Sequence, residues 1–342
     1  MTTTTERAKA PSSAEDSSLS KRLKALFGNQ QVILLLVLLA MIAFFTSRNS
    51  IFFSVDVAGN VLLDWGPIVL IAVGETFVII SGGIDLSVGA TAGIAGIMAA
   101  YVMQDMTTAG QGETITLLVG TLVCALSGAA VGLLNAVLIN RGRIVPFIAT
   151  LATLSIAGGS AVAFTGGAPI AGGPPNAINL SVPWLGPFST PGLIVVAIVV
   201  VSGLYLHKSR FGRYTYAIGS NPFAARAAGI NVKRHLAKIY ILSGVLAGLA
   251  GMFFYLRLAS GAPTSGAGGE LVAIAAVVIG GASLAGGVGR MTGTVLGSLI
   301  LTTVTSGLII IGVAPNWNRV VVGVMIAAAA CIQSLRTTSR DN

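Results

Sequence analysis

Two carboxyl groups stand in the apolar part of the chain, where ionisable side chains are scarce. Glu75 lies in the run Val-Gly-Glu-Thr-Phe-Val-Ile-Ile, and Asp85 follows in Ser-Gly-Gly-Ile-Asp-Leu-Ser-Val-Gly. A charge at the centre of a bilayer costs roughly 2.5–3.5 kcal/mol on insertion scales, so such residues usually face a bundle interior or a polar cavity. Both carboxyl groups are therefore candidates for lining a solute pathway.

Each carboxyl group also has a structural interpretation. Gly82 and Gly83 can break a helix, and Asp85 would then cap the next helix. Capping and pathway lining carry equal weight for Asp85, and one residue can do both. For Glu75, a pathway or a buried polar network is favoured over a structural hydrogen bond. The neutral polar side chains added to the candidate pathway are Ser87, Asn135 and Asn140.

No residue pattern in the sequence is typical of an enzyme. There is no Gly-Lys dipeptide, and hence no phosphate-binding P-loop. The two histidines, His207 and His235, fit neither a metal-ligand nor a metalloprotease pattern. Cys124 and Cys331 both lie in apolar runs, without the spacing of a disulfide framework or metal site. We expect no catalytic site, no metal and no cofactor.

The composition is that of an all-α polytopic membrane protein. The chain has 342 residues, of which 54% are hydrophobic and 9% charged, whereas a soluble domain carries about 25% charge. At about 20 residues per span, the length allows about ten transmembrane helices. Roughly eight or eleven spans are alternatives, because Gly-rich runs such as 266–289 can form broken or re-entrant helices. The predicted spans are 31–47, 61–80, 86–103, 114–139, 144–164, 192–206, 235–256, 271–284, 292–312 and 317–335.

The basic residues predict the orientation of these spans. Of the 20 Lys and Arg residues, 17 fall on segments assigned to the inner side, and Arg48, Arg257 and Arg319 are the exceptions. Both termini are therefore expected in the cytoplasm. The same arrangement explains the net charge of +9 without a nucleic-acid partner. The predicted organisation is a disordered tail at 1–24, a transmembrane domain at 25–335 and a second cytoplasmic tail at 336–342.

The loop 207–238 is the longest polar interval and holds seven Lys and Arg residues but no Asp or Glu. We place it in the cytoplasm. Asn221 can cap a helix, Pro222 suits its first position and Gly229 can end it. The pattern predicts a helix of about two turns on the cytoplasmic surface. An ordinary connector with a short helix is an equally weighted alternative.

Glycine and tryptophan positions make two smaller predictions. The pairs Gly128/Gly132, Gly244/Gly248 and Gly293/Gly297 have the spacing at which membrane helices pack closely. Trp65, Trp184 and Trp317 fall at the outer ends of predicted spans, where interfacial anchoring is favoured over partner docking.

Four ordered segments resemble the permease subunits of bacterial sugar ABC transporters of the ribose, xylose and arabinose type. They are 74–89, 140–150, 219–230 and 280–289, and the resemblance extends over 31–333. It implies a multi-pass subunit of the inner membrane that contacts membrane lipid and works as a dimer, which is expected to be a homodimer. It further implies a cytoplasmic ATP-binding cassette subunit, a periplasmic or extracellular sugar-binding protein, and a type II importer arrangement with two inverted halves.

The resemblance also assigns a role to the basic loop. Ala224, Ala225 and Gly229 match the Ala-Ala-xxx-Gly core of the coupling motif of importer permeases. Phe223 stands where that motif often has Glu, so apolar docking to the ATPase is expected in place of a salt bridge. The residues assigned to ATPase coupling are Asn221, Pro222, Phe223, Ala224, Ala225, Arg226 and Gly229.

Three functions are weighed. The main one is an importer permease for a monosaccharide or similar small polar solute, with ATP hydrolysed by another subunit. The second is a self-sufficient secondary transporter with Glu75 and Asp85 as a proton relay. The third is a membrane scaffold without transport. The carboxyl groups beside a Gly-rich helix break argue against a scaffold. The sequence does not identify the solute.

Overall fold

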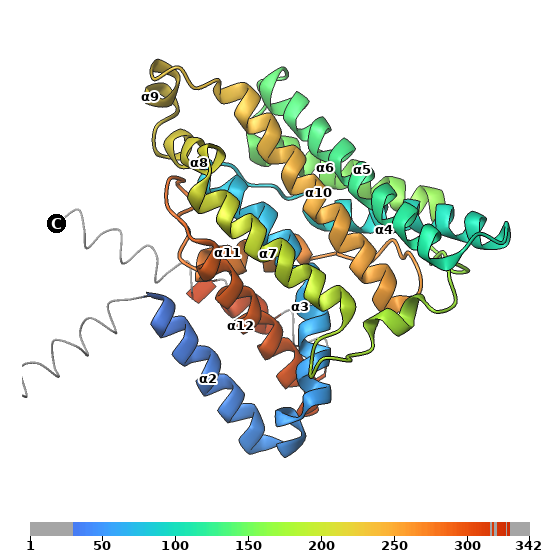
Figure 1. The fold of residues 1–342 in the computed structure, drawn as a ribbon. Helices are drawn as coiled ribbons and strands as arrows, with labels where there is room; N and C mark the ends of the chain where they lie inside the picture. Colours follow the sequence, from blue (N-terminus) through green and yellow to red (C-terminus); the bar gives the residue numbers. More distant parts are fainter. Residues whose placement is uncertain (1–29, 315–316, 318–319, 326, 329–342) are drawn as a thin grey trace, which may run out of the picture.

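A computed structural model describes residues 30–314, 317, 320–325 and 327–328, and these are mainly helical (Figure 1). The predicted tails at 1–24 and 336–342 lie outside the described residues, and the predicted last span is described only in part. The elements in chain order are α2 (Gln30–Arg48), η1 (Ser50–Phe53), α3 (Val55–Ile80), α4 (Val88–Thr108), α5 (Glu113–Asn140), α6 (Pro146–Thr165), η2 (Ala177–Ser181), α7 (Thr190–Lys208), α8 (Arg210–Ser220), α9 (Pro222–Ala227), α10 (Val232–Leu258), α11 (Gly269–Ile279) and α12 (Met291–Ile310).

Among the described residues, 7 helices are long and apolar enough to cross a membrane: α2, α3, α5, α6, α7, α10 and α12. The polytopic class is thus confirmed, while the count of ten spans and the orientation of the termini stay predictions. Several predicted boundaries were wrong by a few residues. Helix α3 begins at Val55, because the Ser54 side chain accepts a hydrogen bond from Val57 N at 3.2 Å and caps it there. Helix α11 ends at Ile279, five residues before the predicted end of that span.

The predicted Gly-rich interruptions are present. The chain leaves helical geometry between α3 and α4, where Gly82 has φ +85°. A second break separates α11 from α12, and Gly281, Gly286 and Gly287 have positive φ there. Helix α11 has 11 residues and is about 16 Å long. Because the hydrocarbon core is about 30 Å thick, α11 does not cross it alone.

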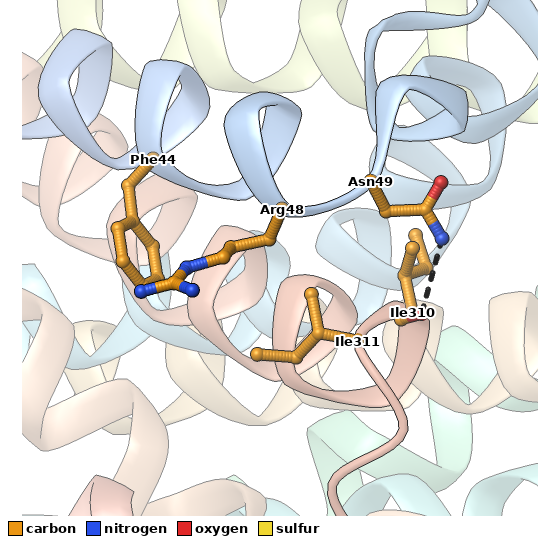
Figure 2. Close-up of a pocket in the computed structure, with 5 residues that line it drawn as sticks. All are labelled: Phe44, Arg48, Asn49, Ile310 and Ile311. Atoms are coloured by element: carbon orange, nitrogen blue, oxygen red, sulfur yellow. Dashed lines mark hydrogen bonds between the residues drawn. The ribbon is translucent and has the colours of Figure 1, made fainter.

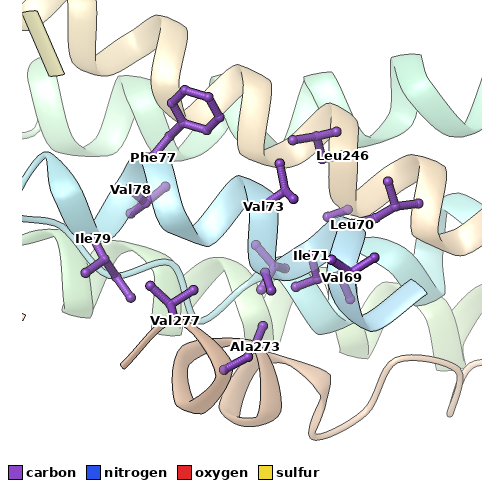
Figure 3. Packing of buried hydrophobic residues seen from close by; sticks show 14 of the residues in the cluster. Val69, Leu70, Ile71, Val73, Phe77, Val78, Ile79, Leu246, Ala273 and Val277 are labelled. Atoms are coloured by element: carbon purple, nitrogen blue, oxygen red, sulfur yellow. The ribbon is translucent and has the colours of Figure 1, made fainter. Parts of the chain in front are cut away.

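Helix α3 forms the centre of the bundle. Every residue from Val69 to Ile80 is buried. In α2, by contrast, only 11% of the most apolar 18-residue stretch is buried. Figure 3 shows residues of α3 packed against Leu246 of α10 and against Ala273 and Val277 of α11. On the α3–α4 break, the Asp85 and Ser87 side chains are therefore enclosed by protein, whereas Ile84 and Leu86 are partly exposed.

Close helix crossings bear out the packing role of the glycine pairs. Gly128 of α5 lies so close to the Gly244 carbonyl of α10 that a Cβ would overlap it, and Gly297 approaches the Ala276 carbonyl of α11 in the same way. The interfacial role predicted for Trp65 was wrong, because its ring is 5% exposed and its Nε1 donates to Ser298 Oγ at 2.8 Å. Trp184 and Trp317 are exposed.

Candidate functional site

Glu75 and Asp85 meet at the end of α3. The backbone N–H of Asp85 donates a hydrogen bond to Glu75 Oε1 at 3.1 Å, and the two side chains are 0% and 1% exposed. Glu75 lies five residues before the last residue of α3, and so closer to the α3–α4 break than to the middle of the helix. The chain thus folds back over its own helix end and brings the two carboxyl groups together.

The Asp85 carboxylate accepts four hydrogen bonds. Its Oδ1 accepts from Ser87 N at 3.0 Å, from Ser87 Oγ at 2.6 Å and from Asn135 Nδ2 at 3.3 Å, and its Oδ2 accepts from Ser243 Oγ at 3.3 Å. Asn135 Nδ2 also donates to Ser87 Oγ at 2.8 Å. Asp85 is not the N-cap residue of α4, because Ser87 occupies that position. Its bond to Ser87 N is a local turn that shapes the break.

The structure brings together four of the five pathway candidates: Glu75, Asp85, Ser87 and Asn135. Asn140 lies apart from them. Its Nδ2 donates to the Lys233 carbonyl at 2.9 Å and ties the end of α5 to the start of α10. The geometry therefore gives Asn140 a helix-joining contact away from the carboxyl groups.

Sequence reasoning missed two members of the cluster, Ser243 and Tyr240 of α10. Ser243 is 0% exposed, and a Cβ at Gly74 of α3 would lie 3.0 Å from its Cα. The Tyr240 ring is 1% exposed. A signal was available, because Tyr240 precedes Gly244 by one helical turn and so shares the closely packed face of α10.

Among the described residues, no basic side chain hydrogen-bonds either carboxyl group of the cluster. The one salt bridge among these residues joins Arg257 to Asp64 at 2.9 Å, outside the cluster. No group of three or more His, Cys, Asp or Glu side chains is found there either. The cluster consequently lacks the donor set of a transition-metal site. It is a buried, oxygen-rich site with two carboxyl groups.

The short helix predicted in the basic loop is confirmed as α9. The Asn221 side chain accepts hydrogen bonds from Phe223 N and Ala224 N, both at 3.0 Å, and Pro222 is the first helical residue. Gly229 ends the turn with φ +83°. Helices α8 and α9 project at one end of the bundle (Figure 1).

The two faces of α9 differ. The Phe223 side chain is 79% exposed, and Ala224 and Arg226 are also exposed. Ala225, in contrast, is 4% exposed and packs with Ile218 and Val232. Ala225, which was assigned to ATPase coupling from the sequence, thus faces α8 and α10 and does not lie on the exposed face of α9.

Helix α8 connects α9 to both helix breaks. Gly219 packs so closely on the Ile80 carbonyl and the Gly287 N–H that a Cβ would overlap them, and Gly287 N itself donates to Ile80 O at 2.9 Å. The Tyr216 hydroxyl donates to the Gly289 carbonyl at 2.7 Å. Burial raises the pKa of Tyr216 and nearby Arg290 opposes the rise, so the group stays a donor at neutral pH. Helix α8 thus contacts the end of α3 and the α11–α12 break, and it leads along the chain into α9.

A surface pocket of about 510 Å³ lies away from the cluster, where the ends of α2 and α12 meet (Figure 2). It is lined by Phe44, Arg48, Asn49, Ile310 and Ile311. The Arg48 guanidinium carbon lies 5.4 Å from the centre of the Phe44 ring, and Asn49 Nδ2 donates to Ile310 O at 3.5 Å. None of these residues belongs to the carboxyl cluster.

Comparison with known proteins gives a consistent set of relatives. Residues 57–330 match the family model described as the permease component of the branched-chain amino acid transport system. The chain is 38% identical over 305 residues to the ribose import permease protein of Escherichia coli K12, covering 88% of this chain and 92% of that one. It is 41% identical over 271 residues to the ribose import permease protein of Bacillus subtilis 168, covering 77% and 80%.

A second kind of relative carries a different sugar in its name. The chain is 37% identical over 316 residues to the galactose/methyl galactoside import permease protein of Escherichia coli K12, covering 89% of this chain and 93% of that one. No solved structure gives a significant match.

Proposed function

The chain belongs to this family of permease components, and we propose that it is the membrane-spanning subunit of an ATP-driven importer in the bacterial inner membrane. The solute is a monosaccharide or a similar small polar molecule. The observation that carries the proposal is the similarity over most of the chain to permeases named for ribose and for galactose import. Because these two sugars differ, the similarity supports a solute class and no single sugar.

The energy source is a separate cytoplasmic subunit with an ATP-binding cassette. The chain has no P-loop of its own. Helix α9 supports such a partner, because it is capped at both ends and presents Phe223 to the outside without a contact that its own fold requires. An exposed aromatic side chain on a rigid short helix is a suitable anchor for a groove on another protein. The contact of Gly219 with Ile80 supplies a route from α9 to α3.

The complete importer contains a second permease chain, taken to be identical, and a sugar-binding protein outside the membrane. Solute passes between the two permease chains. We place Glu75, Asp85, Ser87 and Asn135 on or next to this path. In the conformation described, their side chains are enclosed within one chain, so contact with solute requires the α3–α4 break to move.

A proton-coupled secondary transporter is the alternative. Two buried carboxyl groups beside a helix break are the observation that favours it, because discontinuous helices commonly form coupling-ion sites in such transporters. Family membership favours the importer.

Reconstitution separates the two functions. The purified chain is placed in liposomes with and without a candidate ATPase subunit and sugar-binding protein from the same organism, and the uptake of radiolabelled ribose and galactose is measured. We expect uptake only when both partners are present and ATP is supplied on the side of the membrane that the ATPase subunit faces. Uptake by the chain alone, driven by a proton gradient, would establish the secondary transporter instead.

A further inference from the structure

Unpartnered polar atoms concentrate around Asp85. The described residues contain four buried side-chain polar atoms without a hydrogen-bond partner, and three of them belong to this cluster: Glu75 Oε2, Asn135 Oδ1 and the Tyr240 hydroxyl. The three side chains are 0%, 0% and 1% exposed. A buried polar group left unpaired costs about 1–3 kcal/mol. Three such groups in one place therefore indicate a ligand that they share.

The three groups belong to three helices that meet around Asp85 and Gly83. Glu75 of α3 accepts from Asp85 N at 3.1 Å, and Asn135 of α5 donates to Asp85 Oδ1 at 3.3 Å. The Tyr240 hydroxyl of α10 lies within electrostatic range of both carboxyl groups. A Cβ at Gly83 would lie 2.5 Å from that hydroxyl oxygen, so the glycine leaves the room that the hydroxyl occupies.

The donor set selects the kind of ligand. Asp85 already accepts four hydrogen bonds, which compensate its charge. The remaining groups are one carboxyl oxygen, one amide oxygen and one phenol oxygen, which carry a single negative charge when Glu75 is ionised. Oxygen ligands prefer hard cations. The site also lies in the last turns of α3, where the negative end of the helix dipole favours a cation.

We propose that this cluster binds a monovalent cation of the Na⁺ type through Glu75 Oε2, Asn135 Oδ1 and the Tyr240 hydroxyl. The ion joins α3, α5 and α10 next to the α3–α4 break and stabilises the closed arrangement of that break. It neutralises the one carboxylate charge that the protein leaves uncompensated. The proposal concerns the folded chain and holds whichever solute, if any, the chain carries.

The test is thermal unfolding of the purified full-length chain in detergent. NaCl is titrated against choline chloride at fixed pH and fixed total ionic strength, with LiCl and KCl as parallel series. Because a ligand bound only to the folded state raises its stability by mass action, Na⁺ should give a saturable rise in Tm of about 2–4 °C. Choline, an organic cation much larger than Na⁺, should give none.

Variants assign the effect to these residues. Glu75→Gln should abolish the Na⁺-dependent rise, and Tyr240→Phe, which keeps the ring in the core, should weaken it. Asp56→Asn is the matched control, because Asp56 is an exposed carboxyl group on the same helix, and it should keep the full response. If Glu75→Gln does not yield folded protein, Tyr240→Phe decides.

Three results would overturn the proposal. One is an equal Tm in Na⁺, Li⁺, K⁺ and choline. Another is a full Na⁺ response in both Glu75→Gln and Tyr240→Phe. The third is a Tm of the unsubstituted chain that rises at low pH in choline chloride but does not respond to Na⁺ at any pH. Glu75 would then hold a proton in place of a cation.

Discussion

The backbone N–H of Asp85 donates to the Glu75 carboxyl group at 3.1 Å, so one carboxyl group fixes the chain segment that carries the other. Glu75 lies in the last turns of α3, and Asp85 lies within the break that follows, beyond Gly82 and Gly83. Burial of both side chains in a bundle of apolar helices makes this contact a determinant of the break's shape. Substitutions at the two positions should consequently differ in what they impair.

Asp85→Leu should prevent stable folding, whereas Asp85→Asn should not. Leucine removes the acceptor of four hydrogen bonds, so the buried donors of Ser87, Asn135 and Ser243 lose their partner at Asp85. Each unpaired buried donor costs about 1–3 kcal/mol. The amount of monodisperse protein after solubilisation, measured by fluorescence-detected size exclusion, is the readout. Asp105→Leu, at an exposed carboxyl group of α4, is the control and should give the parental amount.

Glu75→Gln should reduce solute uptake while the complex still assembles. Glutamine keeps the size of the side chain and an oxygen that can accept from Asp85 N, but it removes the charge. Uptake in cells is compared with the amount of permease and of co-purified ATPase subunit, with Asp56→Asn as the control on the same helix. Parental uptake by Glu75→Leu at a parental protein level would remove Glu75 from the proposed pathway.

Local signals in the sequence were sufficient for several parts of the fold. Asn221, Pro222 and Gly229 predicted the bounds of α9, because capping and positive φ depend on nearest neighbours. Gly82 and Gly83 predicted the α3–α4 break for the same reason. The glycine pairs on α5 and α10 predicted close packing but not which helices would meet.

Tertiary contacts decided the rest. Ser243 and Tyr240 join the cluster because α10 crosses α3 and α5 at glycines, and no periodicity in the sequence names the partner of a helix. Trp65 sits at the predicted outer end of a span, yet Ser298 of α12 supplies a buried acceptor for its N–H. The inward face of Ala225 likewise depends on contacts with Ile218 and Val232.

Gly219→Ala should separate ATP hydrolysis from transport. The added methyl group would overlap the Ile80 carbonyl and the Gly287 N–H, so α8 must shift relative to the end of α3. Overpacking of this kind typically costs about 1–3 kcal/mol. We expect ATPase binding and hydrolysis to persist in proteoliposomes while uptake falls. Gly159→Ala, where the new methyl group meets open space, is the control and should transport normally.

Cysteines placed at Arg226 and Ala168 should report opposite sides of the membrane. Both residues are exposed, so their labelling depends on the side that they face and not on burial. On a background without Cys124 and Cys331, an impermeant maleimide added to intact cells should label position 168 and not position 226. Permeabilised cells should show labelling at both positions. Ready labelling at 226 in intact cells would invert the orientation predicted from the basic residues.

Phe223→Ala should weaken docking of the ATPase subunit without unfolding the permease. The Phe223 side chain is 79% exposed, so its loss should change the stability of the isolated chain by no more than about 0.5 kcal/mol. An aromatic anchor at an interface is worth about 2 kcal/mol or more, which is roughly a 30-fold change in affinity. The readouts are co-purification of the ATPase subunit, uptake and the thermal unfolding of the chain alone.

Neighbouring substitutions distinguish docking from folding. Arg226→Ala removes an exposed rim charge and should slow association more than it weakens the complex. Ala225→Glu forces a carboxylate against Ile218 and Val232, so it should lower the yield of folded chain as well as docking.

Gly229→Val strains a residue with φ +83°, whereas Ala228→Val introduces the same side chain at φ −77°. The first should uncouple transport and the second should not. If Phe223→Ala retains the ATPase subunit and transports at the parental rate, α9 is a connector and the ATPase docks elsewhere.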